Sequence, residues 1–496
     1  MPDLDLGLVV GPEGPKGKDG KDGTNGEKGE QGDPGPRGLQ GIQGVPGVDA
    51  TINSVNALTL AAGEGVSMSQ EGGTITLGFP DAAAINTGVA AVKGDTSAIL
   101  AELKGQRPKR YGFRVKISEP NPATRVEYLF DAVGMTPAFM DFTTGAFNMG
   151  TWGGVWFVRD NYPVMVKFDG TEDYRLDPTD YTKKLKDGSA SDVANTAYGG
   201  NAMTAIPCCW VKRWEEDGYR YVVFCETQYD DGYKAYAHTR ADGSIEKVHY
   251  YPMFKGCMVD SKLRSLSGQY PQYTTTADAE RTAARANGAK WDLRNWAMDE
   301  LIADLLVLLS KSTNSQAAFG QGQTTGYVND AAQHYGHIQS GTLNNKGQFF
   351  GYNDTTHQVK VFHMEGFWGG RWDRMVGLLY ANGIFKVKMT PEGDGYNFTG
   401  AGYTAVGEVN ITGSSGGYIK DTKQSEYGCL PAALTGSDAT YECDACWYNP
   451  AIVSVCLRGG RCADGSVCGA RSLSASATAS RADWYIGGSL SLESPS

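Results

Sequence analysis

The chain has 496 residues, which predicts several structural units and at least one with a substantial core. Its 66 glycines, together with 11% aromatic residues, indicate that one part is fibrous and another is an aromatic-rich globular body. Lys and Arg are scattered and the net charge is -11, so the sequence lacks a broad basic face and we expect no nucleic acid partner.

The start of the chain and its apolar segments bear on its location. Residues 1–10 carry Asp3 and Asp5 and lack a positively charged stretch followed by an apolar run, so we expect no signal peptide and folding in a cytosol. The strongest apolar run, residues 301–309, is short and contains Asp304. It predicts a core helix, and we expect no membrane insertion. In this setting the ten cysteines are expected to be free thiols.

A glycine stands at every third position from Gly11 to Gly47 without interruption. This period is typical of the collagen triple helix, in which only glycine fits at the crowded axis of three chains. A flexible Gly/Pro linker has no reason to keep such a phase. Residues 11–48 therefore predict a collagen-like triple helix in a homotrimer, a rod about 110 Å long.

Two further stalk segments are predicted. In residues 49–80, alternating runs such as 57–60 and 74–77 separated by glycine-bearing turns indicate a β-rich trimeric neck. In residues 81–107, apolar side chains recur at alternating spacings of four and three, which predicts a coiled coil. An amphipathic helix packed on the following domain is the alternative.

Residues 111–496 predict a globular head. Apolar and aromatic runs at 113–117, 155–158 and 219–224 are typical of strands. Residues 278–287 and, after Gly288, residues 291–309 predict helix, the second part buried on most sides. Few helices among many loops indicate an α+β fold.

Four short motifs follow one another in this head: WDLRNW at residues 291–296, EGFWGGRW at 365–372, RGG at 458–460 and IGGSLS at 486–491. Their order resembles the C-type-lectin-like fold shared by formylglycine-generating enzymes and phage tail receptor-binding proteins. The fold class expected is α+β: a C-type-lectin-like head on a fibrous trimeric stalk of collagen-like triple helix, short β segment and short coiled coil. Fold likeness alone does not decide function.

The likeness to phage tail proteins implies a trimeric tail fibre of the virion, made in the host cytoplasm. Residues 1–10 would attach to a phage tail or baseplate protein, and the head at 111–496 would bind a bacterial cell-surface glycan or protein receptor. A structural virion trimer without a ligand is the alternative.

The enzyme branch of the same fold implies a different chemistry. There an Arg-Gly-Gly element precedes a cysteine pair that binds copper, and Cys462 and Cys468 lie in the corresponding stretch. Their spacing is one residue longer than in that family, and the family's Gly-Phe-Arg ending is here Ile486-Gly487-Gly488. We therefore expect no enzymatic activity and no cofactor, with a copper-dependent oxidase as the remaining alternative.

In the phage branch the same segment is a ligand-binding surface diversified by retroelements that mutate adenines. Such mutation of asparagine-type codons cannot create Lys, Glu, Gln, Met or Trp. Residues 443–485 contain no Lys, Glu, Gln or Met, and their only tryptophans, Trp447 and Trp484, are expected to belong to the scaffold. Ordinary loop residues are the alternative. The predicted ligand-binding residues are Arg461, Cys462, Asp464, Val467, Arg471, Ser472, Ser474, Ser476, Arg481, Asp483 and Tyr485.

Three weaker signals are interpreted as structural. Cys443 and Cys446 have zinc-like spacing but lack a second close pair. His334 and His337 have no neighbouring ligand at helical spacing and are expected on the surface. Glu215-Glu216 lies beside glycine in turn-like sequence and is expected at a solvated loop end rather than in a glycan-cleaving site.

Overall fold

The computed structural model describes residues 67–71, 74–78, 107–406, 411–412 and 415–494. The chain divides into two compact units, Met1–Ala101 and Glu102–Ser496. In the first unit, β1 (Ser67–Glu71) and β2 (Thr74–Gly78) pair as an antiparallel hairpin, with Glu71 opposite Thr74. The strand predicted at 74–77 is therefore present. The predicted triple helix at 11–48, the strand expected at 57–60 and the predicted coiled coil up to residue 106 lie outside the described residues and stay predictions.

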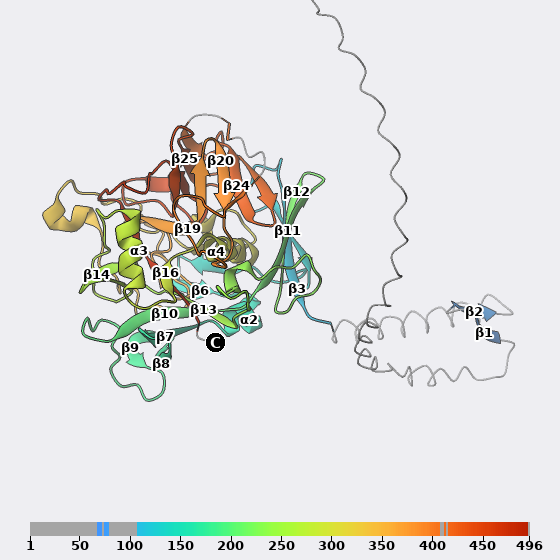
Figure 1. Ribbon diagram of the computed structural model, residues 1–496. Coiled ribbons are helices and arrows are strands. Elements are labelled where there is room, and N and C mark those ends of the chain that lie inside the picture. Colours follow the sequence, from blue (N-terminus) through green and yellow to red (C-terminus); the bar gives the residue numbers. More distant parts are fainter. Residues whose placement is uncertain (1–66, 72–73, 79–106, 407–410, 413–414, 495–496) are drawn as a thin grey trace, which may run out of the picture. The chain divides into compact units, whose positions relative to one another are not determined.

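The second unit is rich in β-sheet and has few helices (Figure 1). Its seven-stranded sheet has the order β16 (Trp291–Leu293), β29 (Leu490–Glu493), β13 (Val248–Pro252), β10 (Gly200–Pro207), β7 (Tyr162–Lys167), β8 (Glu172–Asp177) and β9 (Asp180–Lys184). A four-stranded antiparallel sheet has the order β11 (Trp210–Glu216), β12 (Tyr219–Cys225), β3 (Arg110–Lys116) and β4 (Val126–Phe130).

The third large sheet contains much of the C-terminal part of the chain. Its order is β21 (Thr404–Ala405), β20 (Ile384–Val387), β19 (Trp372–Ala381), β26 (Ser454–Arg458), β27 (Leu473–Ala475), β25 (Ala445–Tyr448) and β22 (Gly416–Tyr418), and β28 (Ile486–Gly488) pairs in parallel with β19. Four hairpins complete the strands: β5 (Phe139–Asp141) with β6 (Ala146–Asn148), β14 (Cys257–Val259) with β15 (Lys262–Arg264), β17 (Lys360–Val361) with β18 (Met364–Glu365), and β23 (Asp421–Ser425) with β24 (Gly428–Ala433).

The α-helices of the head are α2 (Trp156–Arg159), α3 (Ala277–Arg285), α4 (Trp296–Ser310) and α5 (Ser315–Phe319). Short 3-10 turns are η2 (Trp152–Gly154), η3 (Tyr236–His238), η4 (Ala331–Gly336) and η5 (Gly465–Val467). The three large sheets surround α4 in Figure 1. Every residue of α4 except Ser310 is buried, as predicted for the apolar run at 301–309.

The strand predictions at 113–117 and 219–224 are confirmed by β3 and β12, but the one at 155–158 is wrong. Residues 155–158 were expected to be a strand and instead enter the short helix α2. A short apolar run fits a buried helix as well as a buried strand, and here Trp156 and Phe157 pack against Tyr111 of β3.

The helix predicted over 291–309 begins only at Trp296. Residues 291–293 form β16, which pairs with β29, and the Asn295 side chain caps α4 by accepting a hydrogen bond from the Met298 backbone N–H at 2.9 Å. Asparagine at this position satisfies a backbone donor that the helix leaves unpaired, so it fixes where the helix starts.

Acidic side chains of α4 pair inside the core with arginines that lie far away along the chain. Glu300 accepts hydrogen bonds from Arg458 at 2.6 Å and from Arg471 at 2.8 Å, and Asp304 pairs with Arg213 at 2.7 Å and with Arg471. Burial alone would raise the pKa of Glu300, but Arg471 and Arg458 lower it to about 2. Removing one partner from such a buried cluster leaves an uncompensated charge, so these pairs tie α4 to the sheets.

Candidate functional site

Three separate segments bring aromatic rings together on one part of the head. Trp484 stacks on Tyr327 with ring centroids 4.2 Å apart, and on Tyr335 at 5.6 Å. Tyr485 meets Trp484 edge to face at 5.2 Å. Stacked and edge-to-face pairs at these separations are favourable, so the rings support one another.

A third segment extends this group. Tyr273 packs edge to face on Tyr335 at 5.5 Å, and the Tyr270 ring stacks on His334 at 3.5 Å. Tyr270 and Tyr327 remain 37% and 38% exposed, so the rings form a surface rather than a core. We call this the aromatic surface; it consists of Tyr270, Tyr273, Tyr327, His334, Tyr335, Trp484 and Tyr485.

Two arginines border the aromatic surface, each beside a carboxylate. The Arg461 guanidinium lies 4.2 Å from the centre of the Tyr485 ring, and its Nε donates to Asp464 at 2.8 Å. Arg481 donates to Asp483 at 2.6 Å and to the Tyr485 hydroxyl at 2.5 Å. Each cation is neutralised locally, so this edge offers hydrogen-bonding groups without a strong net charge.

The structure divides the predicted ligand-binding residues into two groups. Arg461, Asp464, Arg481, Asp483 and Tyr485 are at least partly exposed and meet at the aromatic surface. Val467 and Ser476 are also partly exposed. Whether these seven bind a ligand stays a prediction.

The other four are buried, which corrects their expected place on the surface: Cys462, Arg471, Ser472 and Ser474. Arg471 pairs with Glu300 and Asp304 of α4, and its backbone N–H donates to Asp444 at 2.6 Å. Its positive charge thus completes the buried ion cluster of α4. The sequence could not show this, because the acidic partners lie far away along the chain.

Backbone hydrogen bonds fix the C-terminal segment that carries Trp484 and Tyr485. The Thr274 N–H donates to the Asp483 carbonyl at 3.0 Å, and the Trp372 N–H donates to the Tyr485 carbonyl at 2.8 Å. The His337 ring lies 2.9 Å from the Trp484 carbonyl through Nε2. These bonds do not depend on the side chains of residues 483–485, so those side chains can change while the backbone stays in place.

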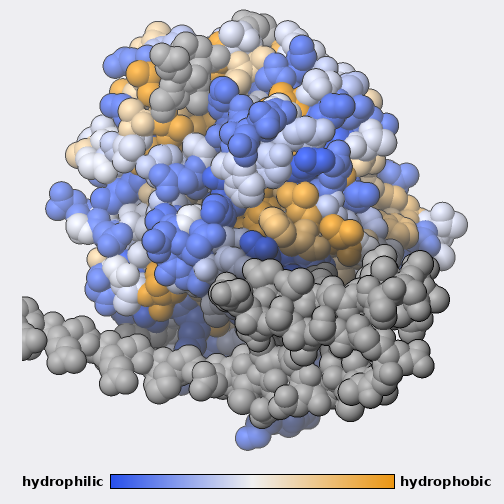
Figure 2. Space-filling model, turned by 90° about the vertical axis from the view of Figure 1, so that its right-hand side faces the viewer, coloured by the Kyte–Doolittle hydropathy of each residue, from blue (hydrophilic) through white to orange (hydrophobic). Residues whose placement is uncertain are grey.

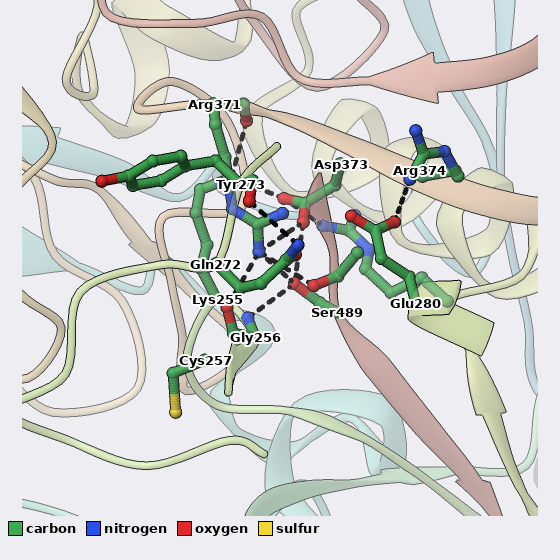
Figure 3. A network of polar contacts seen from close by, with 12 residues as sticks. Lys255, Gly256, Cys257, Gln272, Tyr273, Glu280, Arg371, Asp373, Arg374 and Ser489 are labelled. Carbon is green, nitrogen blue, oxygen red and sulfur yellow. Dashed lines mark hydrogen bonds and ion pairs between the residues drawn. The ribbon is translucent and has the colours of Figure 1, made fainter. Parts of the chain in front are cut away.

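A buried network of charged side chains underlies the same segments (Figure 3). Asp373 accepts from Lys255 at 2.5 Å and from Ser489 at 2.7 Å. Burial alone would raise the pKa of Asp373, but Lys255 and Arg371 hold it well below its usual value. In turn, burial lowers the pKa of Lys255 to about 8 against the opposing effect of Asp373.

Arg374 connects this network to the aromatic surface. It pairs with Glu280 of α3 and donates to the carbonyl of Thr275 at 3.2 Å and to that of Arg481 at 2.9 Å. One buried guanidinium therefore holds both loops that flank Tyr273 and Tyr485. The arrangement is a rigid base beneath side chains that face outward.

The cysteines that correspond to the copper pair do not fit that role. All ten cysteines lie among the described residues and are free thiols, as predicted. The Cys462 thiol lies 3.8 Å from the Tyr335 carbonyl, and the Cys468 thiol 3.5 Å from the Arg461 carbonyl. Burial raises the pKa of Cys462 to about 11 and also raises that of Cys468, whereas a thiolate is the form that binds metal. This arrangement does not support the oxidase alternative.

The weaker signals have mixed outcomes. His337 is buried rather than on the surface, and burial lowers its pKa to about 4. Glu215 binds Lys423 at 3.0 Å, as a structural ion pair. Within the part of the chain that the structure describes, no three His, Cys, Asp or Glu side chains group so as to hold a metal ion.

Sequence reasoning missed Tyr270, Tyr273, Tyr327 and Tyr335. The abundance of tyrosine in the loops after α4 was a signal for Tyr327 and Tyr335 only, and it did not show which rings would meet. Aromatic loops assembled from distant segments are visible only once the fold is known.

The family model described as collagen triple helix repeat (20 copies) matches residues 9–51, which include the glycine period at 11–47. No curated protein matches the chain. The chain thus combines a collagen-like repeat with a C-terminal domain rich in β-sheet. No helix among the described residues is long and apolar enough to cross a membrane.

Proposed function

We propose that this protein is the receptor-binding subunit of a bacteriophage tail fibre. In this proposal the head has the C-type-lectin-like fold, and its aromatic surface attaches the virion to a glycan or protein on a bacterial cell. The observation that carries the proposal is the meeting of Trp484, Tyr327 and Tyr335 beside Arg461. Tyr, Trp and Arg are the residues that most often anchor binding surfaces, because they bury large areas with few rotatable bonds.

The retroelement hypothesis fits the same place. Arg481, Asp483 and Tyr485 project from a segment whose backbone is held by Thr274 and Trp372, so exchanges there would alter the surface without moving its base. A reverse transcriptase gene with a template repeat beside the gene for this chain is the expected genetic signature. Its absence would contradict diversification but not receptor binding.

Trimerisation is the second part of the proposal. The collagen-like repeat requires three chains, and three heads raise the effective concentration of weak single sites. The head also carries exposed apolar side chains, among them Phe130, Val133, Phe139 and Tyr229. We call these four the apolar patch.

The apolar patch is tied to the first residues of the head. Arg107 pairs with Asp131 at 2.8 Å, and the Arg110 guanidinium lies 4.2 Å from the ring centres of both Phe130 and Tyr229. Figure 2 shows apolar side chains gathered on this side of the head among hydrophilic ones. Since the collagen-like repeat places other copies of the chain alongside, we propose that a second copy of the head covers this patch.

Labelled full-length protein, mixed with a panel of bacterial strains, tests receptor binding. We expect some strains to retain the protein and others not, with retention abolished by periodate for a glycan receptor or by protease for a protein receptor. No retention by any strain, or equal retention by all of them, would contradict the proposal.

A further inference from the structure

One end of the seven-stranded sheet presents a row of polar side chains on one face. His249 of β13 stands opposite Glu493 of β29, and Ser491 of β29 stands opposite Asp292 of β16. Residues directly opposite in an antiparallel pair, and residues two apart in a strand, share a face of the sheet. These four side chains therefore point the same way.

The alternate residues of the same strands confirm this division. Tyr250, Leu492 and Trp291 belong to a buried hydrophobic cluster. These three side chains point to the opposite face of the sheet, as the period of two requires. The polar row is thus not an extension of the core.

The four polar residues line a cavity of about 260 Å³. Residues of the segments 236–241 and 391–396 also line it, and Tyr236 and Tyr396 add aromatic surface to its wall. A cavity with aromatic walls and a few converging polar groups is the usual form of a small-molecule site. This cavity shares no lining residue with the aromatic surface.

His249 is the most unusual group in the wall. It is 7% exposed, and its Nδ1 lies 2.5 Å from Oε1 of Glu246. Burial alone would raise the pKa of Glu246, but His249 lowers it, so this carboxylate is ionised and accepts from Nδ1–H. Nε2, the other ring nitrogen, can hydrogen-bond a further partner.

Nε2 of His249 has no hydrogen-bond partner among the described residues. A buried ring nitrogen left unpaired is costly, and a ligand hydroxyl in the cavity would satisfy it. Ser491, whose hydroxyl donates to the Leu293 carbonyl at 2.9 Å, keeps its lone pairs as further acceptors.

The inner wall carries little free charge. Asp292 is held by Arg281 at 2.8 Å and by Arg285 at 3.0 Å. Burial raises the pKa of Glu493, helped by the nearby Glu246, which favours its uncharged form. Lys290 and Asp394 also line the cavity and add one charge of each sign, so its wall has no strong net charge. A ligand with several hydroxyls would find donors and acceptors there.

We infer that the cavity between His249, Ser491 and Glu493 binds a single sugar ring. The hydroxyls of the ring would pair with the polar row, and its C–H face would pack on Tyr236 or Tyr396. This site is separate from the proposed receptor surface and does not depend on it.

Saturation-transfer NMR on the full chain tests the inference, with the methyl glycosides of glucose, galactose, mannose and N-acetylglucosamine as probes. We expect at least one probe to bind. Ala289→Phe should fill the cavity from its exposed rim and weaken that binding by about tenfold or more, which corresponds to about 1.4 kcal/mol. Ala123→Phe, at another exposed turn residue, is the matched control and should bind normally.

His249→Phe should also abolish the saturation-transfer signal. Because this buried substitution can prevent folding, the exposed substitution Ala289→Phe serves as the second, independent variant. Trp484→Ala should leave the signal unchanged while reducing attachment to cells, which separates this site from the receptor surface. Absence of binding by all four neutral glycosides overturns the inference. Binding that survives Ala289→Phe, or a stronger response to acetate or methylamine than to the glycosides, overturns it as well.

Discussion

The Arg461 guanidinium covers the Tyr485 ring at 4.2 Å while its Nε binds Asp464 at 2.8 Å. The salt bridge holds the cation over the ring, and both Arg461 and Tyr485 remain partly exposed. An arginine fixed in this way can contact a receptor without first losing conformational entropy. The position of Arg461 is therefore a direct probe of the proposed binding surface.

Arg461→Ala should weaken attachment to susceptible cells by about tenfold, because it removes a pre-positioned contact worth about 1 to 2 kcal/mol. Its thermal unfolding should hardly change. The matched control is Arg114→Ala, since Arg114 also binds a carboxylate, Glu127 at 2.6 Å, and covers a tyrosine, Tyr219 at 4.3 Å. Equal loss of attachment in both variants would show that the effect is not specific to the aromatic surface.

Arg471→Ala should destabilise the head by about 3 to 5 kcal/mol, because Glu300 and Asp304 would keep buried negative charge without their partner. Arg481→Ala, at an exposed position in the same segment, should cost about 0.5 kcal/mol or less. Denaturant unfolding compares the two. Similar unfolding midpoints would mean that Arg471 is not part of a buried cluster.

These arginines show what the sequence could and could not predict. The glycine period at 11–47 is a local rule, so the collagen-like repeat was visible directly. The strands β3 and β12 followed from local composition in the same way. Arg471 and Arg481 look alike in the sequence, and only the fold shows that one faces α4 and the other faces solvent.

The aromatic surface was beyond local reasoning for a related reason. Tyr273, Tyr327 and Trp484 come from loops that meet only after three sheets have packed. The strand prediction for residues 155–158 was wrong for a different reason, because a short apolar run fits a helix and a strand equally well. The C-type-lectin-like likeness itself stays a prediction.

The head should lose stability as the pH falls from 6.5 toward 4. Burial lowers the pKa of His337 from 6.5 to about 4, so the folded head holds this ring neutral while the unfolded chain protonates it. The neutral His337 ring therefore adds to the free energy of unfolding. This addition is complete above pH 6.5 and is lost progressively below it, by about 3 kcal/mol near pH 4. Melting temperatures measured across this range should fall.

His337→Gln should flatten part of that pH dependence, because the amide can donate to the Trp484 carbonyl without titrating. His334→Gln, which replaces a partly exposed ring, should leave the profile as in the wild type. If the melting temperature of His337→Gln depends on pH as that of the wild type does, other buried groups cause the pH dependence.

Val133→Asp combined with Phe139→Asp should separate the heads of the trimer while the collagen-like repeat keeps the chains together. These side chains are 68% and 43% exposed in the single chain, and a carboxylate in an apolar contact between copies is costly. Small-angle scattering should show a larger radius of gyration at an unchanged trimeric mass. Ile384→Asp combined with Val453→Asp changes residues of similar exposure, 44% and 47%, and should leave the radius unaltered. An unaltered radius in the first pair would contradict the head-to-head contact.

The most direct test of receptor binding compares two tryptophans that are alike except in position. Trp484 stacks on Tyr327 within the aromatic surface, and Trp214 stacks on Tyr221 at 4.6 Å on the sheet of β11 and β12; both are partly exposed. The affinity of Trp484→Ala and of Trp214→Ala for a strain that retains the wild type should be measured alongside thermal unfolding. Trp484→Ala should bind at least thirtyfold more weakly, a loss of about 2 kcal/mol, with Trp214→Ala close to the wild type. Wild-type affinity in a folded Trp484→Ala would contradict the account and place the receptor site elsewhere on the head.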